Sequence, residues 1–301
     1  MKFGVVIANQ RATADRVGDE LERVEALGYD SAWMPGIPNG PDVLTLFSAT
    51  AQRTSRIEVG PAIVSAHGRH PVALASQALT THDALRGRLT LGIGVSHQRV
   101  VEDFFGLDYS HPARFMAEYL QVLHPLLNGE KADFAGQLLR TSFRLDIASP
   151  EPAPSVFTAA VGPKMLDVAG TLSDGAATWM VGLRTLSEVT VPLTHAAAQR
   201  ALRPAPRILA SLPFALTSDD ETATAWAREE FGMYGRLPAY KAVLEREGFD
   251  SAAGIAIHGD EGALTKAVDR VRDAGVTDLQ ITPFGDDETR RRTVDFLATL
   301  R

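Results

Sequence analysis

The sequence predicts an α/β protein with the (β/α)8 TIM-barrel fold and short insertions. Two observations lead to this prediction: short apolar runs typical of buried parallel strands alternate with helical patterns along the whole chain, and there are eight such runs. Alternation of this kind requires parallel pairing, so the other candidate is an open doubly wound sheet. The length of 301 residues suits a barrel, which takes about 250 residues as a single unit. We therefore expect residues 1–301 to form one domain.

Each expected strand is a short apolar run, rich in β-branched residues and bounded by turn residues. The runs are Phe3–Ala8, Asp30–Met34, Ile57–Val64, Leu89–Gly94, Val156–Ala160, Gly175–Val181, Ile208–Leu216 and Thr277–Pro283. Helical patterns fill the intervals, with Gly28 and Gly87 as stop signals and Pro71 at a first helical position. The expected helices are Val17–Leu27, Leu44–Thr54, Pro71–Leu85, Pro112–Leu127, Lys164–Leu172, Leu186–Leu202, Glu221–Glu247, Glu261–Ala274 and Glu288–Leu300.

Three segments depart from simple alternation. The segment Phe134–Leu145 is expected to form a β-hairpin or an extended excursion outside the barrel. The connections Ser149–Pro154 and Arg203–Arg207 are rich in proline, and each directly precedes an expected strand. Rigid surface loops are common at such places, so we interpret both as loops and not as domain boundaries.

Composition excludes several classes of protein. With 45% hydrophobic and 22% charged residues the chain matches a soluble globular protein. The net charge of −7, without a long basic run, argues against nucleic acid as a partner. The absence of cysteine excludes disulfides, thiolate metal sites and a thiol nucleophile. The apolar run at Met1–Ala8 is too short for a signal peptide, and no stretch of about 18 apolar residues occurs, so we expect a cytoplasmic protein without membrane contact.

Barrels hold their active sites at the C-terminal ends of the strands, and the first such end to attract notice is Gly60–Pro71. His67 and His70 form an H-x-x-H pair, but no carboxylate motif accompanies it, so we expect no metal site. One interpretation is that His70–Pro71 is a helix entry, with His70 or Arg69 hydrogen-bonding loop carbonyls. The other is a contact with a cofactor or substrate. Two further histidines, His82 and His124, fall within expected helices, where they pack or face solvent.

The second strand end is Gly92–His97. Its glycines have the spacing of a dinucleotide-binding loop, but His97 occupies the place of the third glycine, so a Rossmann assignment fails. Ser96 lacks the final glycine of a nucleophile elbow. A glycine here lets a flat ligand lie against the main chain, and His97 can then donate or accept a proton. The alternative is that His97 only caps the following helix, Gln98–Phe104.

The third strand end is Thr158–Lys164, where a strand runs into a helix through small residues and Pro163. Helix N-termini attract phosphate. The segment lacks G-K-[ST], so a nucleoside-triphosphate loop is excluded, whereas one phosphate of a flavin-type cofactor fits. Ordinary helix capping is the alternative.

Taken together and in this order, several stretches resemble the luciferase-like monooxygenase superfamily, particularly its branch dependent on the deazaflavin coenzyme F-420. The matching stretches are Glu25–Trp33, Val59–Ile63, Arg69–Pro71 with Ala75–Leu79, Gly87–Gly94, Gly162–Leu166 and Ser173–Ala176. Each is weak alone, but the ordered set covers most of the chain. The resemblance implies a (β/α)8 barrel, an oxidoreductase activity and a homodimer.

The resemblance also implies a cofactor site. A bulge with a non-proline cis peptide at Ala62–Ile63 would back the central ring. The residues implied to contact the cofactor are Ala62, Ile63, Val64 and Ser65 at the bulge, Gly94, Val95, Ser96 and His97 along the ring and ribityl side, Ala160, Val161, Gly162, Pro163 and Lys164 at the phosphate, and Trp179, Met180 and Gly182 closing that end.

His97 would occupy a position where relatives place a polar or acidic residue near the reacting carbon. The chain also departs from the family, because Pro35–Ile37 stands where relatives acting on sugar phosphates or alcohols often have Ser-Asp-His. The alcohol-oxidising base is therefore missing at that strand end, which argues against those activities.

Our hypothesis is an oxidoreductase that moves a hydride between coenzyme F-420 and a small organic substrate, with His97 as catalytic proton donor or acceptor. The alternatives are an FMN-dependent monooxygenase and a barrel that has lost its chemistry and serves as a binding subunit. Substrate choice depends on loops, here Pro35–Pro41, Asp103–His111 and Phe231–Gly248.

Overall fold

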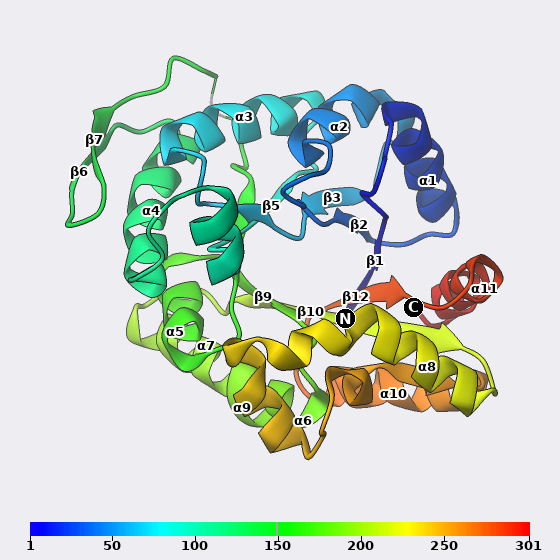
Figure 1. Cartoon of the computed structure of the whole chain (residues 1–301). Helices are drawn as coiled ribbons and strands as arrows, with labels where there is room; N and C mark the ends of the chain where they lie inside the picture. The colour runs from blue at the N-terminus through cyan, green and yellow to red at the C-terminus, as the bar shows by residue number, and fades with distance from the viewer. Residues whose placement is uncertain (149) are drawn as a thin grey trace.

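The computed structural model describes residues 1–148 and 150–301 and contains a closed barrel of parallel strands (Figure 1). The barrel strands are β1 (Lys2–Val6), β2 (Ser31–Met34), β3 (Glu58–Pro61), β4 (Val64–Ser65), β5 (Thr90–Gly94), β8 (Ser155–Ala159), β9 (Gly175–Trp179), β10 (Arg207–Leu216) and β12 (Asp278–Pro283). They pair in the order β3-β2-β1-β12-β10-β9-β8-β5-β4. A parallel bridge between Val59 and Leu89 joins β3 to β5 and closes the ring. The prediction of a TIM barrel is confirmed.

Helices surround the ring of strands (Figure 1). They are α1 (Ala14–Ala26), α2 (Val43–Thr50), α3 (Pro71–Ala84), α4 (Pro112–Leu127), α5 (Pro163–Leu172), α6 (Leu183–Thr185), α7 (Val191–Arg200), α8 (Asp220–Phe231), α9 (Pro238–Glu247), α10 (Glu261–Asp273) and α11 (Asp287–Leu297). Several begin at an N-cap whose side chain accepts a bond from a backbone amide of the first turn, as Asp42, Asp219 and Asp260 do. Each of these caps sets the residue at which a loop ends and the next helix begins.

Three expectations need correction. The strand expected at Ile57–Val64 is interrupted at Ala62–Ile63, so β3 and β4 are two parts of one barrel strand. The single helix expected over Glu221–Glu247 is broken by a 3-10 turn, η4 (Gly232–Arg236), because Pro238 has no amide hydrogen and cannot continue a helix from its preceding turn. A short strand, β11 (Ile257–Gly259), pairs with the end of β10 and was not expected.

The expected hairpin is present as β6 (Ala132–Ala135) and β7 (Arg140–Phe143), which pair antiparallel and project from one side of the barrel (Figure 1). Its tip is fixed by Glu118 of α4, whose carboxylate accepts bonds from the backbone amides of Gln137, Leu138 and Leu139. The expected packing of His82 is confirmed, since the ring is buried and its Nε2 lies 3.1 Å from the carbonyl oxygen of Pro152.

The barrel interior toward the N-terminal ends of the strands is filled by large side chains. Trp33 of β2 and Phe157 of β8 stack with ring centroids 6.0 Å apart, and Leu209 and Ala177 pack with them. The guanidinium carbon of Arg207 lies 4.8 Å from the centroid of the Phe157 ring. Because this end is plugged, a ligand reaches the barrel only from the C-terminal ends of the strands.

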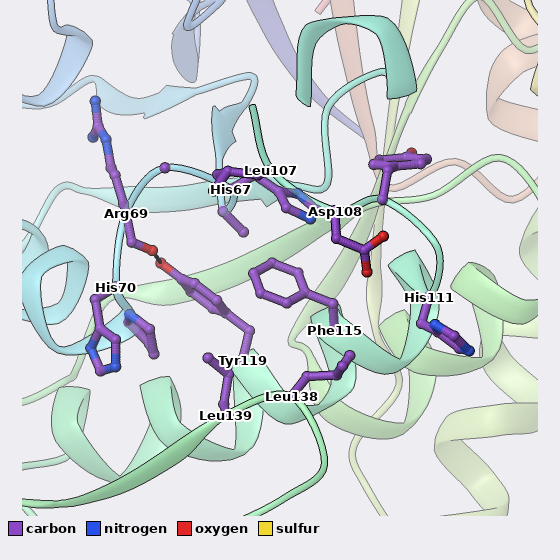
Figure 2. Close-up of a pocket in the computed structure, with 14 residues that line it drawn as sticks. His67, Arg69, His70, Leu107, Asp108, His111, Phe115, Tyr119, Leu138 and Leu139 are labelled. Atoms are coloured by element: carbon purple, nitrogen blue, oxygen red, sulfur yellow. Dashed lines mark hydrogen bonds between the residues drawn. The ribbon is translucent and has the colours of Figure 1, made fainter. Parts of the chain in front are cut away.

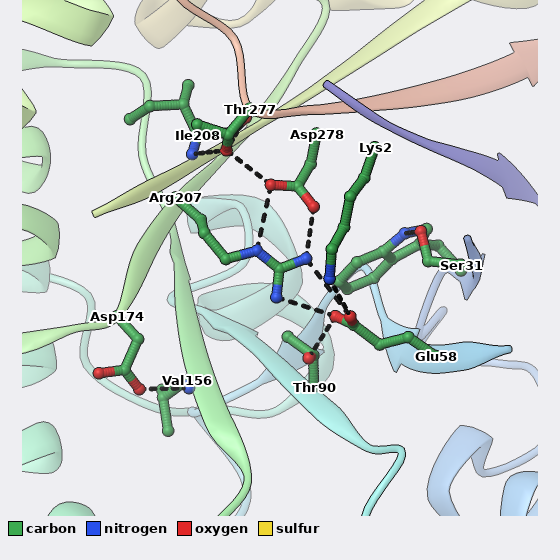
Figure 3. Close-up of polar contacts among 11 residues, drawn as sticks. Lys2, Ser31, Glu58, Thr90, Val156, Asp174, Arg207, Ile208, Thr277 and Asp278 are labelled. Carbon is green, nitrogen blue, oxygen red and sulfur yellow. Dashed lines mark hydrogen bonds and ion pairs between the residues drawn. The ribbon is translucent and has the colours of Figure 1, made fainter. Parts of the chain in front are cut away.

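The N-terminal ends of the strands are joined by an ion network (Figure 3). Arg207 at the start of β10 pairs with Asp278 of β12 and with Glu58 of β3, at 3.1 Å for Nη1 to Oε1 of Glu58. Lys2 of β1 lies 3.0 Å from Glu58, and Thr90 of β5 donates to it at 2.5 Å. Burial raises the pKa of Glu58, but the charge of Arg207 and the bonds from Thr90 and Lys2 outweigh burial and hold that pKa below its usual value.

Within the described residues, no helix is both long and apolar enough to cross a bilayer.

Candidate active site at the C-terminal ends of the strands

The bulge between β3 and β4 is held from both sides. Its Ala62 amide donates to the carbonyl of Met34 at 2.9 Å, and the Ile63 carbonyl accepts from the amide of Gly36 at 3.1 Å. The peptide bond between Ala62 and Ile63 is cis, as the resemblance implies. A Cβ atom on Gly36 would lie 2.6 Å from the Ile63 carbonyl oxygen. The Pro35–Ile37 segment therefore needs a glycine so that the strand end can pack against the bulge.

The glycine at the end of β5 allows close packing of the neighbouring strands. A Cβ atom on Gly94 would lie 2.9 Å from Cβ of Ala159 and 3.0 Å from Cδ1 of Ile63. The glycine therefore lets Ile63 lie against β5. The contact of Gly94 with a flat ligand stays a prediction.

Two aromatic side chains hold the segment that follows β5. His67 Nδ1 lies 3.0 Å from the carbonyl oxygen of Val95, and the hydroxyl of Tyr109 donates to the carbonyl of Ser96 at 3.0 Å. Ser96 has a φ of 63°, a left-handed conformation that a residue other than glycine keeps only when its surroundings enforce it. The side chain of His97 projects from this segment, so His67 and Tyr109 fix its direction.

The two histidines of the H-x-x-H pair have separate contacts. His67 is buried, bonds Val95 and stacks on Phe115 with ring centroids 4.2 Å apart. His70 is the N-cap of α3, so the helix entry at His70 is confirmed, but its Nδ1 accepts from the amide of Val72 at 3.3 Å and does not bond a loop carbonyl. Across residues 1–148 and 150–301, no group of three or more histidine or acidic side chains is arranged to hold a metal ion.

His97 faces Tyr234 of η4. Its ring lies 6.4 Å from that of Tyr234 in an edge-on arrangement, and Tyr234 lies 5.7 Å from Trp179 at the end of β9. The imidazole is solvent-accessible, yet the surrounding protein atoms displace enough water to lower its pKa below the usual 6.5. The backbone carbonyl of His97 accepts from the amides of Val100 and Val101, which begins the turn η2 (Val100–Phe104). This turn is thus capped by the main chain of His97 and not by its imidazole.

Polar atoms without partners mark this end of the barrel. Asn9, just after β1, donates its amide to the Pro35 carbonyl at 2.6 Å, but its Oδ1 is buried without a partner. Ser65 Oγ at the end of β4 and Trp179 Nε1 at the end of β9 are also buried without a partner among the described residues. Buried polar atoms are nearly always hydrogen-bonded, so unpaired ones at strand ends point to a ligand that carries both donors and acceptors.

The N-terminus of α5 is open. Gly162 is its N-cap, no side chain caps it, and a Cβ atom on Gly162 would meet no heavy atom within 4 Å. In the part of the chain that the structure describes, the amides of Gly162 and Lys164 have no backbone or side-chain acceptor. The amide of Ala160 bonds the carbonyl of Ala177 at 2.9 Å, and Pro163 has no amide hydrogen. The expected set of main-chain phosphate donors therefore contracts to Val161, Gly162 and Lys164.

The next helix start, at Gly182, is filled. Glu247 at the end of α9 accepts from the amide of Thr185 at 2.6 Å and from that of Arg184 at 3.3 Å, and a Cβ atom on Gly182 would lie 2.3 Å from its carboxyl carbon. A carboxylate already complements the positive end of α6. Met180, which comes shortly before Gly182 in the sequence, is fully buried and has a φ of 52°. Its side chain therefore packs beneath the solvent-exposed strand ends.

A comparison with protein families identifies the architecture. The family model described as luciferase-like monooxygenase matches residues 1–298. The chain belongs to this family. Its members are oxidoreductases on a TIM-barrel-like fold, so the strand ends described above are the expected place for redox chemistry.

Two curated relatives in the family cover most of the chain. The protein Mb1395 of Mycobacterium bovis, described as uncharacterized, is 32% identical over 263 residues, which are 83% of this chain and 76% of its own length. The F-420-dependent hydroxymycolic acid dehydrogenase of Mycobacterium tuberculosis is 26% identical over 317 aligned residues and covers 98% of this chain and 86% of its own.

Solved structures of the family share the fold and use different cofactors. The coenzyme F-420-dependent tetrahydromethanopterin reductase of Methanopyrus kandleri superposes with a TM-score of 0.84 at 20% identity, covering 99% of this chain and 97% of its own. The oxygenating constituent of 3,6-diketocamphane monooxygenase of Pseudomonas putida, in complex with FMN, gives a TM-score of 0.78 at 17% identity, with coverage of 99% and 97%. At these identities the likeness shows the fold alone.

Sequence reasoning did not single out several residues of this candidate site. Tyr234 lies in Phe231–Gly248, which was named as a substrate loop but also counted in one long helix, although Gly232, Gly235 and Pro238 signal a break there. Asn9 follows the first strand directly, and its position alone could have flagged it. Glu247 had no signal, because its partner amides lie 62 and 63 residues away in sequence.

Proposed function

We propose that this chain is an oxidoreductase that binds the deazaflavin coenzyme F-420 across the C-terminal ends of the strands and moves a hydride between it and a small organic substrate. The observation that carries the proposal is the open N-terminus of α5, at the same end of the barrel as the bulge and His97. A phosphate is held by unpaired backbone amides and a nearby cation, and Gly162 and Lys164 offer both. A relative dependent on F-420 that matches 98% of the chain favours the deazaflavin over FMN.

The buried polar atoms without hydrogen-bond partners are compatible with a bound deazaflavin or flavin. Ser65 Oγ can donate or accept, Asn9 Oδ1 accepts and Trp179 Nε1 donates, which matches the mixed hydrogen-bonding edge of a deazaflavin or flavin ring. The bulge residues Ala62 to Ser65 would back the ring, and Val95 to His97 would border it. When bound, the cofactor supplies a ring carbon that gives or takes a hydride.

In this proposal, His97 exchanges a proton with the substrate. Its lowered pKa leaves the imidazole neutral at pH 7, so it can accept a proton from a substrate that is being oxidised. In an oxidation, the hydride with its two electrons would pass from the substrate carbon to the bound cofactor, and the proton that the substrate releases would pass to an imidazole nitrogen of His97. In the reverse direction His97 returns that proton. Tyr234, in edge-on contact with the ring, limits its movement.

The test is a spectroscopic titration of the purified protein with F-420 and, separately, with FMN. We expect saturable binding of F-420 at one per chain in the micromolar range and weaker binding of FMN. Preferential binding of FMN would replace the deazaflavin by the flavin and make the protein a flavin-dependent monooxygenase candidate. Binding of neither cofactor at micromolar concentration would overturn both enzyme assignments and leave a binding subunit.

A further inference from the structure

A second cavity lies beside the proposed cofactor site, with a volume of about 400 Å³ (Figure 2). It is bounded by the loop after β4, the loop before α4, the inner face of α4 and the tip of the β6–β7 hairpin. The lining residues are Ala66, His67, Gly68, Arg69, His70, Pro71, Leu107, Asp108, Tyr109, His111, Phe115, Tyr119, Leu138 and Leu139. Its volume lies within the range of about 300–1,000 Å³ that is typical of small-molecule sites.

The cavity is separated from the cofactor side by a wall. His67 and Tyr109 approach from the cavity and bond the carbonyls of Val95 and Ser96, whose chain continues to His97 on the other side. A ligand in the cavity therefore contacts the rings of His67 and Tyr109 and not the reacting centre. The cavity is therefore distinct from the proposed cofactor position, although part of the loop Asp103–His111, which we connected with substrate choice, lines it.

The polar groups of four lining residues, Tyr119, Tyr109, Arg69 and His67, are already engaged. The hydroxyl of Tyr119 donates to the Arg69 carbonyl at 3.1 Å, and that of Tyr109 is bonded to Ser96. The Arg69 guanidinium is paired with Asp42 at 2.5 Å and bonds Gln77 at 3.1 Å, so it presents little free charge. Burial lowers the pKa of His67, with its bond to Val95 opposing, which leaves this wall neutral at pH 7. What remains toward the cavity is mainly aromatic and aliphatic surface.

The mouth of the cavity is also apolar. Leu107 and Leu138 are each 41% exposed, and Phe105, next to Gly68 of the lining, is 36% exposed. Bonds from Ser110 hold the pKa of Asp108 below its usual value, so its carboxylate stands ionised at the rim. A negative rim disfavours anions, and aromatic walls favour flat rings.

We propose that this cavity binds a neutral, mainly apolar small molecule with a planar ring system. Binding of such a ligand is favourable because apolar surface is buried against Phe115, Leu138 and Leu139. A neutral ligand also brings no charge that would be buried without a partner.

The experiment uses two probes with the same rings and different charge. N-phenylnaphthylamine is neutral, and anilinonaphthalene sulfonate carries an added sulfonate. Fluorescence titration of the full chain is expected to show saturable binding of the neutral probe at one per chain and at least about tenfold weaker binding of the anionic one. Equal binding of both, or no saturation by the neutral probe, would overturn the proposal.

Variants locate the bound probe. Leu139→Trp fills the cavity and Leu138→Asp places a charge at its mouth, and each is expected to weaken binding of the neutral probe about tenfold. Leu202→Asp is the matched control, because Leu202 is 94% exposed and lies near the N-terminal end of β10, at the other end of the barrel. Circular dichroism checks that all three variants fold. An equal loss in Leu202→Asp, or no loss in both cavity variants, would contradict the proposal.

A final titration adds F-420 to the protein saturated with the neutral probe. Retention of the probe is expected, since the two sites lie on opposite sides of the Val95–Ser96 wall. Direct displacement with a one-to-one exchange would mean that the probe occupies the cofactor site, and the separate cavity site would be wrong. If instead F-420 fails to bind while the probe behaves as expected, the proposed function fails and this site stands.

Discussion

The two ends of the barrel differ in how their polar groups are paired. At the N-terminal ends of the strands, Arg207, Glu58 and Asp278 form a network in which each charge faces an opposite one (Figure 3). At the C-terminal ends, Ser65 Oγ and Trp179 Nε1 are buried without partners among the described residues. Unpaired buried atoms also occur on the helices, at His82 Nδ1 in α3 and His124 Nε2 in α4. The comparison therefore teaches that the charged network is complete within the fold, whereas the unpaired atoms at the open end would find their partners in the proposed ligand.

The same contrast recurs between two neighbouring helix starts at the open end. At α6, the carboxylate of Glu247 takes the amides of Arg184 and Thr185. At α5, Gly162 offers no side chain, and a Cβ atom on it would meet no heavy atom within 4 Å apart from its own chain neighbours and helix. A helix start needs an acceptor for its amides, and at α5 the proposed phosphate would be that acceptor.

The largest effect is expected at the open end, from His97→Gln. Glutamine keeps a polar side chain but cannot exchange a proton, so we expect kcat with the physiological substrate to fall about 100-fold or more, with little change in stability. The rate is followed through the absorbance of the cofactor. In the wild type, kcat for oxidation should fall as the pH drops through the His97 pKa below 6.5, because the base becomes protonated.

The control for that variant is His195→Gln on α7, an exposed histidine away from the strand ends. Unchanged turnover in His97→Gln, with the acid limb of the pH profile intact, would remove the catalytic role while the cofactor assignment could stand.

The next largest effect is expected at the closed end, from Arg207→Met. It leaves the buried Asp278 without a cation and Glu58 with Lys2 alone, and we expect a loss of about 2–3 kcal/mol in unfolding free energy, less than for a fully enclosed pair because the Arg207 side chain is 26% exposed. Urea denaturation measures the loss, and F-420 affinity of the folded protein should stay the same.

Arg203→Met is the matched control at the same end, since Arg203 and its partner Asp174 are 31% and 41% exposed. Its loss should stay below about 1 kcal/mol. Equal losses in the two variants would mean that the network at Glu58 is no more important than a surface pair.

A smaller effect on the free energy of unfolding is expected when the pH is lowered. The folded-state pKa of Glu58 is lowered, so its contribution to stability is fully present above the unfolded pKa of about 4.3 and is lost as the pH falls through the lower folded value. Glu58→Gln should therefore be less stable than the wild type at pH 7 and lose less on acidification. Parallel pH-stability curves for the two proteins would contradict this assignment.

The smallest effect is expected from Tyr109→Phe. It removes the hydroxyl bond to the Ser96 carbonyl and should cost about 1 kcal/mol of stability. Because Ser96 directs His97, kcat should fall several-fold, whereas the affinity for F-420 should change little. A change in stability without any change in kcat would make Tyr109 a purely structural residue.

The fold could be predicted because its signals are local. Eight apolar runs, with proline and glycine at the helix boundaries, predict the barrel. The observed strand bounds lie close to those expected. The correction at Glu221–Glu247 arose because apolar spacing on both sides of Pro238 masked the break.

The site could be predicted only in part. Segments that lie at strand ends were found, whereas the partners of Gly94 and Gly182 were not, because Ile63, Ala159 and Glu247 come from distant parts of the chain. The direction of each strand tells which end a residue occupies, but not which neighbour fills its space. The expected homodimer and cytoplasmic location stay predictions.

The most direct test of the contrast between the ends compares Gly162→Asp with Gly162→Asn. Both are good N-caps at a φ of −93°, so unfolding free energy should stay level or rise by a few tenths of a kcal/mol. Titration with F-420 should show at least about tenfold weaker binding for Gly162→Asp than for Gly162→Asn, because only the carboxylate repels a phosphate. Equal affinities in the two variants would contradict the account, since the open start of α5 would then not hold the cofactor.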